Sequence, residues 1–352
     1  MYNSSMSSCS RVSILLALAG SSFLSVLHAG QIDAIYAFGD SLSDVGNVYT
    51  TTSGAIPGTP YVNGQFSNGN VWVQDLASDL GLAPLTPSLL GGTDYAYGTA
   101  ETGITSFNTS APAADLLGAT GQLTQFQTAV HATADPNALY TIWIGANDLS
   151  DILANASPAQ YASDIGTVAG NIDTAIVALA GMGAQNFLIV TVPDLGKTPN
   201  AIAAGPVAEA GASAISASFD TTLVNGAGPV PSLASIAAGD SINISVLNTY
   251  ALLDAIVADK ELYSFTNVTS PCYTGTYAGY ADVSDPGTVC ATPNQYLFWD
   301  GQHPTAAGSV LVADAALTVV TPEPGSIFLV ATGLFGLFFV HRRARRRYCG
   351  NR

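Results

Sequence analysis

The sequence has very little positive charge. Of its 352 residues only nine are Lys or Arg, and seven of these lie within the first 11 or the last 11 positions. Residues 30–324 hold two basic residues, Lys197 and Lys260, against 25 acidic ones, a formal charge of −23. So acidic a surface repels phosphate backbones. The composition therefore excludes nucleic acid as an expected partner.

Histidine and cysteine are also scarce, with four of each. No His-Glu-x-x-His motif and no Cys/His cluster with metal-ligand spacing is present, so we expect no metal and no other cofactor. The sequence also lacks Gly-x-Ser-x-Gly, Gly-x-Gly-x-x-Gly and Gly-x-x-x-x-Gly-Lys. These absences argue against a nucleophile elbow, a dinucleotide site and a phosphate-binding loop.

The two ends of the chain read as targeting segments. Arg11 precedes the apolar stretch 12–27, and small residues allow cleavage after Ala29, which is typical of a secretory signal peptide over residues 1–29. At the other end, residues 321–352 carry Pro-Glu-Pro, an apolar run at 327–340 and an arginine cluster. At about 15 residues this run would cross only ~22 Å of a ~30 Å hydrocarbon core.

This C-terminal arrangement resembles the PEP-CTERM sorting signal of certain Gram-negative bacteria. The resemblance implies transient membrane association, processing by an exosortase, and delivery to the cell surface or the extracellular matrix. The alternative is a simple C-terminal membrane anchor.

The body, residues 30–320, alternates strand-like and helix-like runs. With 48% hydrophobic residues over its full length, the chain can bury a large core. Short apolar runs predict strands, and Ala-rich stretches between them predict helices. The strands are expected at 32–38, 139–144, 187–192 and 242–247, and the helices at 158–182, 208–223, 250–262 and 305–319. This alternation predicts an α/β fold, a three-layer α/β/α sandwich with a mainly parallel sheet.

In such sheets functional residues gather at the carboxyl ends of the strands. Ser41 comes three residues after the first apolar run, and Gly39 permits a tight turn before it. Its hydroxyl is thus a candidate nucleophile, although Ser and Asp at such a place also serve as helix N-caps. Asn147 follows the second strand after Gly145, and its amide suits an oxyanion or, equally, a turn.

A third candidate group precedes the last predicted helix. Asp300 and His303 are three residues apart across a glycine-containing turn, close enough for the carboxylate to orient the imidazole. His28 and His341 belong to the terminal segments, and His131 fits a solvent-facing loop. His303 is therefore the expected base if a serine nucleophile operates.

Together these blocks resemble the GDSL (SGNH) hydrolases. Gly39-Asp-Ser-Leu42, Gly145-Ala-Asn-Asp148 and Asp300-Gly-Gln-His303 match three family blocks in order and approximate spacing. The remaining block matches 92–101 with a departure, because Thr99 stands where the family has a glycine and Gly98 precedes it. The match runs from about residue 36 to 308.

The resemblance implies a flavodoxin-like SGNH fold and a carboxylic ester hydrolase acting through an acyl-enzyme. Ser41 would be the nucleophile, His303 the base and Asp300 its orienting carboxylate. The oxyanion hole would comprise the backbone N–H groups of Ser41 and of Gly98 or Thr99, together with the Asn147 amide. An ester would be the substrate, and neither the acyl chain nor the alcohol follows from the sequence.

Two alternatives on the same fold stay open: a carbohydrate acetylesterase, and a surface or matrix protein without activity. The body of the chain also keeps two cysteines, Cys272 and Cys290, in one polar segment. In an exported protein such a pair most simply forms a disulfide that closes the loop between them.

Overall fold

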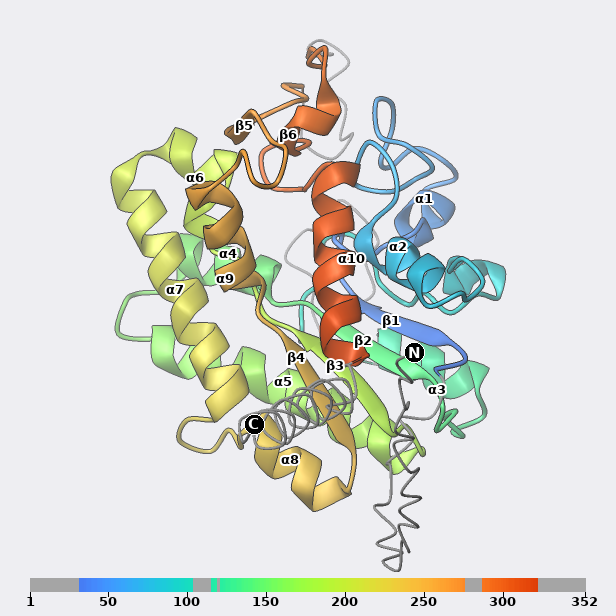
Figure 1. Ribbon diagram of the computed structural model, residues 1–352. Coiled ribbons are helices and arrows are strands. Elements are labelled where there is room, and N and C mark those ends of the chain that lie inside the picture. The colour runs from blue at the N-terminus through green and yellow to red at the C-terminus, as the bar shows by residue number, and fades with distance from the viewer. Residues whose placement is uncertain (1–31, 104–114, 119–120, 276–286, 322–352) are drawn as a thin grey trace, which may run out of the picture.

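A computed structural model shows a four-stranded parallel sheet at the centre of the chain (Figure 1). The structure describes residues 32–103, 115–118, 121–275 and 287–321. The expected signal peptide and almost all of the expected sorting segment lie outside these residues. Among the described helices, none combines the length and hydropathy needed to cross a membrane. The strands, in chain order and in spatial order, are β1 (Ile35–Gly39), β2 (Leu139–Trp143), β3 (Asn186–Val190) and β4 (Asn243–Leu247).

The register brings the carboxyl ends of the strands to one edge of the sheet. Gly39 of β1 pairs with Trp143 of β2, and Val190 of β3 pairs with Leu247 of β4. Every residue of β2 is buried, as expected for a strand covered on both faces. The segments that follow the strands are thereby brought close together in space.

β1 has a neighbour on its other side as well. The Ala37 N–H donates to the Thr93 carbonyl oxygen, and the Tyr95 N–H donates to the Ala37 carbonyl oxygen. The Tyr97 N–H then donates to the Gly39 carbonyl oxygen. Residues 93–97 thus extend the sheet beyond β1, which becomes an inner strand, and the order matches flavodoxin-like folds.

Helices cover both faces of the sheet, which confirms the predicted three-layer α/β/α fold. One face packs against α2 (Trp72–Asp79) and α10 (Ala306–Val320), which also contact each other; α10 lies on the near side in Figure 1. The other face is covered by α3 (Gln122–Ala129), α5 (Tyr161–Gly181), α7 (Pro206–Asn225) and α8 (Leu233–Asp240). Its aromatic centre includes Phe38, Phe126, Tyr140 and Phe187.

Shorter elements lie along the chain between the strands and the larger helices. They are α1 (Asn47–Thr51), η1 (Ser88–Leu90), α4 (Ala146–Asn155), η2 (Leu195–Lys197), α6 (Pro199–Ala204) and α9 (Thr249–Ala258). The four predicted helices are present as α5, α7, α9 and α10, with ends within a few residues of the prediction. The four predicted strands are present as β1 to β4.

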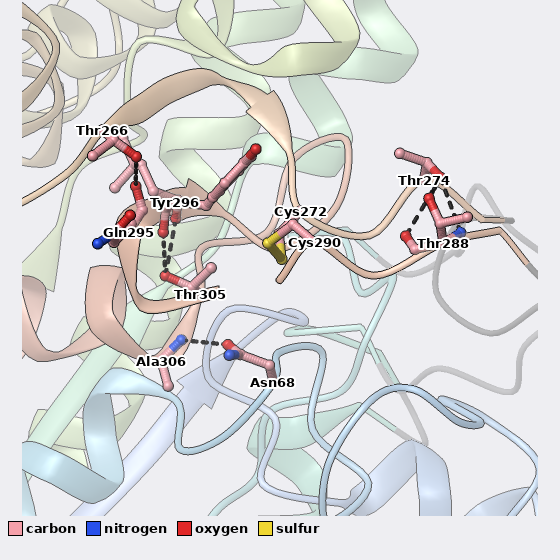
Figure 2. The surroundings of a disulfide bond; sticks show 11 residues. Asn68, Thr266, Cys272, Thr274, Thr288, Cys290, Gln295, Tyr296, Thr305 and Ala306 are labelled. Carbon is pink, nitrogen blue, oxygen red and sulfur yellow. Dashed lines mark hydrogen bonds between the residues drawn. A yellow bond between two sulfur atoms is a disulfide. The ribbon is translucent and has the colours of Figure 1, made fainter. Parts of the chain in front are cut away.

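A small excursion precedes α10. It contains β5 (Asn267–Pro271), η4 (Pro293–Gln295) and β6 (Tyr296–Phe298), and β5 and β6 pair in parallel. Cys272 and Cys290, the predicted pair, are joined by a disulfide with their Cα atoms 4.9 Å apart (Figure 2). The backbone N–H of Cys290 also donates to the Cys272 carbonyl oxygen at 2.8 Å. The two cysteines are therefore joined both by the disulfide and by a main-chain hydrogen bond.

The loop from β6 to α10 is fixed at its far end. Thr305 Oγ1 donates to the Tyr296 carbonyl oxygen at 2.7 Å and accepts from the Gly308 N–H, so one side chain ties β6 to the start of α10. The Ala306 N–H donates to Asn68 Oδ1 at 2.8 Å (Figure 2). Residues 299–304 are therefore held between two anchored elements.

Candidate active site

Ser41 lies in the turn that follows β1. Gly39 ends the strand, and a Cβ at this position would lie 2.4 Å from the carbonyl oxygen at the end of β2, so a side chain would force the strands apart here. The Leu42 N–H donates to Asp40 Oδ1 at 2.9 Å. The main-chain oxygen of Asp40 accepts from the amides three and four residues onward. These bonds fix the path of the turn that carries Ser41.

Gln122, the first residue of α3, holds the same turn from the other side. Its Oε1 accepts from the Gly39 N–H at 2.9 Å, and its Nε2 donates to the Gly39 carbonyl oxygen at 2.7 Å. The Gln122 side chain is fully buried. The sequence reading did not single out this residue, because its partner lies 83 positions away and is a main-chain group.

Ser41, His303 and Asp300 form one hydrogen-bonded chain. Ser41 Oγ lies 2.7 Å from His303 Nε2, although the two residues are 262 positions apart. His303 Nδ1 lies 2.7 Å from Asp300 Oδ2. Ser41 is 6% exposed, and His303 and Asp300 are each 1% exposed. The three residues expected from the sequence are thus in mutual contact and largely shielded from water.

The Asp300 carboxylate is surrounded by donors. Besides His303 Nδ1, it accepts from Tyr61 Oη at 2.6 Å and from the backbone N–H groups of Gln302 and His303 at 2.9 and 2.8 Å. Burial alone would raise the pKa of this carboxyl, but the charge of His303 and these hydrogen bonds lower the pKa below its ordinary value. Asp300 is therefore anionic at neutral pH.

Aromatic rings enclose the imidazole. The ring centroid of Phe66 lies 5.4 Å from that of His303, and the backbone N–H of Trp299 donates to the His303 carbonyl oxygen at 2.8 Å. Tyr61 packs edge-on against Trp299 and Tyr273, next to the disulfide. The contacts of Tyr61 and Phe66 with the histidine and its carboxylate follow from no local sequence pattern and become visible only in the fold.

Gly98 does not fit its expected role as an oxyanion donor. Its N–H donates to Asp44 Oδ2 at 2.8 Å, so this donor is already used within the protein. A Cβ at Gly98 would lie 2.3 Å from the Phe66 ring, which explains the glycine. Of the two residues that the sequence offered for the backbone N–H donor of the oxyanion hole, Thr99 remains the candidate.

Thr99 has φ +66°, in the left-handed region that β-branched residues rarely adopt. The family resemblance puts a glycine here, which has no such penalty. The Oγ1 atom of Thr99 is buried without a hydrogen-bond partner among the described residues.

Asn147, in the first turn of α4, donates from Nδ2 to the Ala100 carbonyl oxygen at 2.8 Å and keeps a second amide hydrogen.

A buried carboxylate network ties the Ser41 turn to the Thr99 segment. Asp44 accepts not only from Gly98 but also from the N–H groups of Gly46, Asn47 and Val48 at the start of α1. The Asn47 amide in turn donates to the carbonyl oxygens of Asp94 and Ala96. Asp44 thus spans two segments 54 residues apart in the sequence.

Several buried carboxyls near the turn have raised pKa values. Burial raises the pKa of Asp40 to about 7 and that of Asp44 to about 6, and hydrogen bonds from backbone N–H groups offset the effect only in part. The pKa of Asp94 is raised well above its ordinary value, first by burial and then by the nearby charge of Asp44.

Ser41 and His303 line a cavity of about 680 Å³ at the carboxyl edge of the sheet. Asn147 also lines it, as do mostly apolar side chains from both helical layers. His131 lies in the exposed turn after α3, as expected, and is not among the lining residues. In the described part of the chain, no group of three or more His, Cys, Asp or Glu side chains could hold a metal ion.

The sequence model of the GDSL-like lipase/acylhydrolase family matches residues 35–316, nearly the whole described body. The chain belongs to this family. Membership makes it a carboxylic ester hydrolase by class. A second model, of the PEP-CTERM protein-sorting motif, matches residues 320–343 and confirms the resemblance of the C-terminal segment.

Two relatives of this chain are about a quarter identical to it in sequence over the aligned residues. A thermolabile hemolysin of Vibrio parahaemolyticus is 25% identical over 83% of this chain, which spans 64% of the hemolysin's length. A GDSL esterase/lipase of Arabidopsis thaliana is 26% identical over 86% of this chain and 91% of its own length. A solved putative GDSL-like lipase from Parabacteroides merdae aligns with 82% of this chain and 96% of its own, with TM-score 0.41 and 11% identity.

The raised carboxyl pKa values predict that stability falls as pH rises. In the unfolded chain these groups titrate near ~3.9, whereas in the folded state Asp40 and Asp44 titrate near 7 and 6. The native state therefore binds more protons between about pH 4 and pH 7, and its stability is lost as pH rises through this window. We expect the free energy of unfolding in urea to be higher at pH 5 than at pH 7.5 by roughly a few kcal/mol.

Two variants test which carboxyl groups cause the pH dependence of the unfolding free energy. Asp40→Asn removes one titrating group, so its unfolding free energy should depend less on pH. Glu261→Gln, at an exposed position, should leave the slope unchanged. A wild-type protein that becomes more stable between pH 5 and pH 7.5 would show that the buried carboxyls are ionised throughout.

Proposed function

We propose that this protein is an exported serine esterase in which Ser41, His303 and Asp300 act as a catalytic triad. The observation that carries the proposal is the hydrogen-bonded chain from Ser41 Oγ through the imidazole to Asp300, with Ser41 and His303 lining an apolar cavity. Relatives named as hemolysin, esterase/lipase and phosphatidylcholine-sterol acyltransferase support acyl ester chemistry.

The mechanism begins with proton transfer. His303 Nε2 takes the Ser41 hydroxyl proton while Oγ attacks the ester carbonyl carbon, and the carbonyl oxygen becomes an oxyanion. Asp300 holds the imidazole by Nδ1 and stabilises the imidazolium, a role that its lowered pKa suits. His303 then protonates the departing alcohol. Water, activated by the same imidazole, releases the carboxylic acid from the acyl-enzyme and restores Ser41.

Three donors are proposed for the oxyanion: the backbone N–H groups of Ser41 and Thr99, and the second amide hydrogen of Asn147. The Asp44 bond to Gly98 supports this choice, because it occupies the neighbouring N–H and fixes the backbone before Thr99. Preorganised donors of this type stabilise charge that develops only in the transition state.

Export rests on the two terminal segments. A signal peptide over 1–29 would direct translocation, and an exosortase would recognise the segment 321–352 during transient membrane association. The disulfide between Cys272 and Cys290 is consistent with an oxidising compartment. Cleavage near Pro-Glu-Pro would deliver the hydrolase to the surface or matrix of a Gram-negative cell.

Ser41→Ala should abolish ester hydrolysis without unfolding the protein, because the change removes one oxygen from a site held mainly by main-chain bonds. Turnover of p-nitrophenyl butyrate and labelling by a fluorophosphonate probe measure the effect, and the far-UV circular dichroism spectrum checks the fold. A wild-type protein that the probe leaves unlabelled would instead be an inactive scaffold, and undiminished turnover by Ser41→Ala would exclude this nucleophile.

The oxyanion donors can be separated by a second pair of variants. Asn147→Ala should lower kcat by ~10²–10³, whereas Thr99→Gly keeps its N–H and should stay within a few-fold of wild type. Thr99→Gly should also unfold at higher urea concentration, because glycine relieves the strain of a positive φ, a penalty on the order of 1 kcal/mol. Asn155→Ala, at the far end of α4, is the matched control. An equal loss of kcat in all three variants would contradict the assignment of the Asn147 amide and the Thr99 N–H as oxyanion donors.

Mass spectrometry of the protein secreted by its native host tests the export proposal. The mature chain should begin near residue 30 and end near Pro-Glu-Pro, without the arginine cluster. A secreted or surface-bound chain that retains residues 342–347 would argue for a permanent anchor instead.

A further inference from the structure

The cavity beside Ser41 crosses the carboxyl edge of the sheet from one helical layer to the other. Its lining comes from α4, α6 and α7 on one side and from α9, β6 and α10 on the other, and Ser41 and His303 lie between these elements. At about 680 Å³ it is the size of sites that enclose a whole small-molecule ligand. An acetyl group would leave most of this volume unfilled.

The side between α4 and α7 is kept open by small residues. Gly211 and Ala208 of α7 face the cavity, and a Cβ added at Gly211 would meet as its nearest neighbour Leu153 Cδ2, at 3.9 Å. Val207, at the N-terminal end of α7, also lines the cavity and is 89% exposed, so this side opens to solvent. This side of the cavity is therefore narrow and apolar, and one end of it is accessible to solvent.

The side between α9 and α10 is apolar as well. Its lining residues are Leu252, Leu253, Ile256, Leu297, Phe298 and Val312. Leu253, Ile256, Leu297 and Phe298 belong to one hydrophobic cluster. Hydrocarbon can thus be accommodated on either side of the carbonyl that Ser41 would attack.

Several polar side chains of the lining are already paired within the protein. Ser150 Oγ donates to the Ala146 carbonyl oxygen, and Thr198 Oγ1 donates to that of Leu195. Thr249 Oγ1 donates to the Thr191 carbonyl oxygen. Pairing the many hydroxyls of a bound sugar needs free partners, and each unpaired buried hydroxyl lowers affinity. These three hydroxyls are therefore not free to donate to a bound sugar, although the polar side chains of Asn147, Asn200 and Gln302 also line the cavity.

From this cavity we infer that the substrate is a fatty acyl ester with a medium or long hydrocarbon chain, rather than an acetylated sugar. The inference rests on the proposed function, because it assigns the chain to the site where Ser41 would attack. Each methylene moved from water to an apolar groove strengthens binding roughly fourfold. Selectivity should therefore rise with chain length until the groove is filled.

A chain-length series tests the inference in the wild-type protein. The substrates are p-nitrophenyl acetate, butyrate, octanoate and decanoate, with acetate release from acetylated xylo-oligosaccharides as the sugar arm. We expect kcat/KM for octanoate to exceed that for acetate by at least about tenfold, and little release from the sugar. An acetate preference, or faster release from the sugar, overturns the inference while leaving the esterase proposal intact.

Two variants fill the two sides of the cavity. Gly211→Leu narrows the α4–α7 side without harming the helix, since leucine is the better helix former, and Leu252→Trp narrows the α9–α10 side. At least one should lower the octanoate-to-acetate ratio of kcat/KM about tenfold. Gly239→Leu is the matched control, on α8, where an added Cβ meets no atom within 4 Å.

The outcomes separate the two proposals. Unchanged ratios in both filled variants, with thermal unfolding showing that they are folded, would mean that the cavity does not hold the chain. No turnover of any ester, together with no fluorophosphonate labelling of wild type, would instead overturn the esterase proposal and this inference with it.

Discussion

The hydrogen bond between Ser41 Oγ and His303 Nε2 is the interaction on which the site depends. It joins two ends of the body that are 262 residues apart in the sequence. β1 ends at the carboxyl edge of the sheet with Ser41 just beyond it, while the loop before α10 returns His303 from the opposite end of the chain. At 2.7 Å the contact has the geometry that proton transfer needs.

The surroundings of this bond hold each partner by main-chain hydrogen bonds rather than by packing alone. Gln122 secures both polar groups of Gly39, and Asp44 connects the nucleophile turn to the segment of Thr99. Buried carboxyls are an expensive way to do this, because each loses solvation. They are compatible with the fold because donors converge on them, as four backbone N–H groups do at Asp44.

Sequence patterns were sufficient for the sheet and its main helices, and they singled out Ser41, Asp300 and His303, which the structure brings together. The spacing of apolar residues indicates which residues of a helix or strand are buried, and a short turn after a strand indicates that its residues lie at the edge of the sheet. Both signals can be found in a short stretch of sequence. The supporting residues could not be found in this way. Tyr61 and Asp300 are 239 positions apart, and no local pattern announces their contact. The choice between Gly98 and Thr99 stayed open in the sequence for a similar reason, since the Gly98 N–H is taken by Asp44, a residue of another segment.

Ser41 and His303 are supported by different hydrophobic clusters. The strand that leads to Ser41 lies within the large cores on the two faces of the sheet, whereas Trp299 packs with Tyr61, Tyr273 and Cys272 in a small aromatic cluster. Trp299, and the loop that runs from it to His303, are therefore held by a few aromatic rings and one covalent bridge, apart from the cores that hold the sheet.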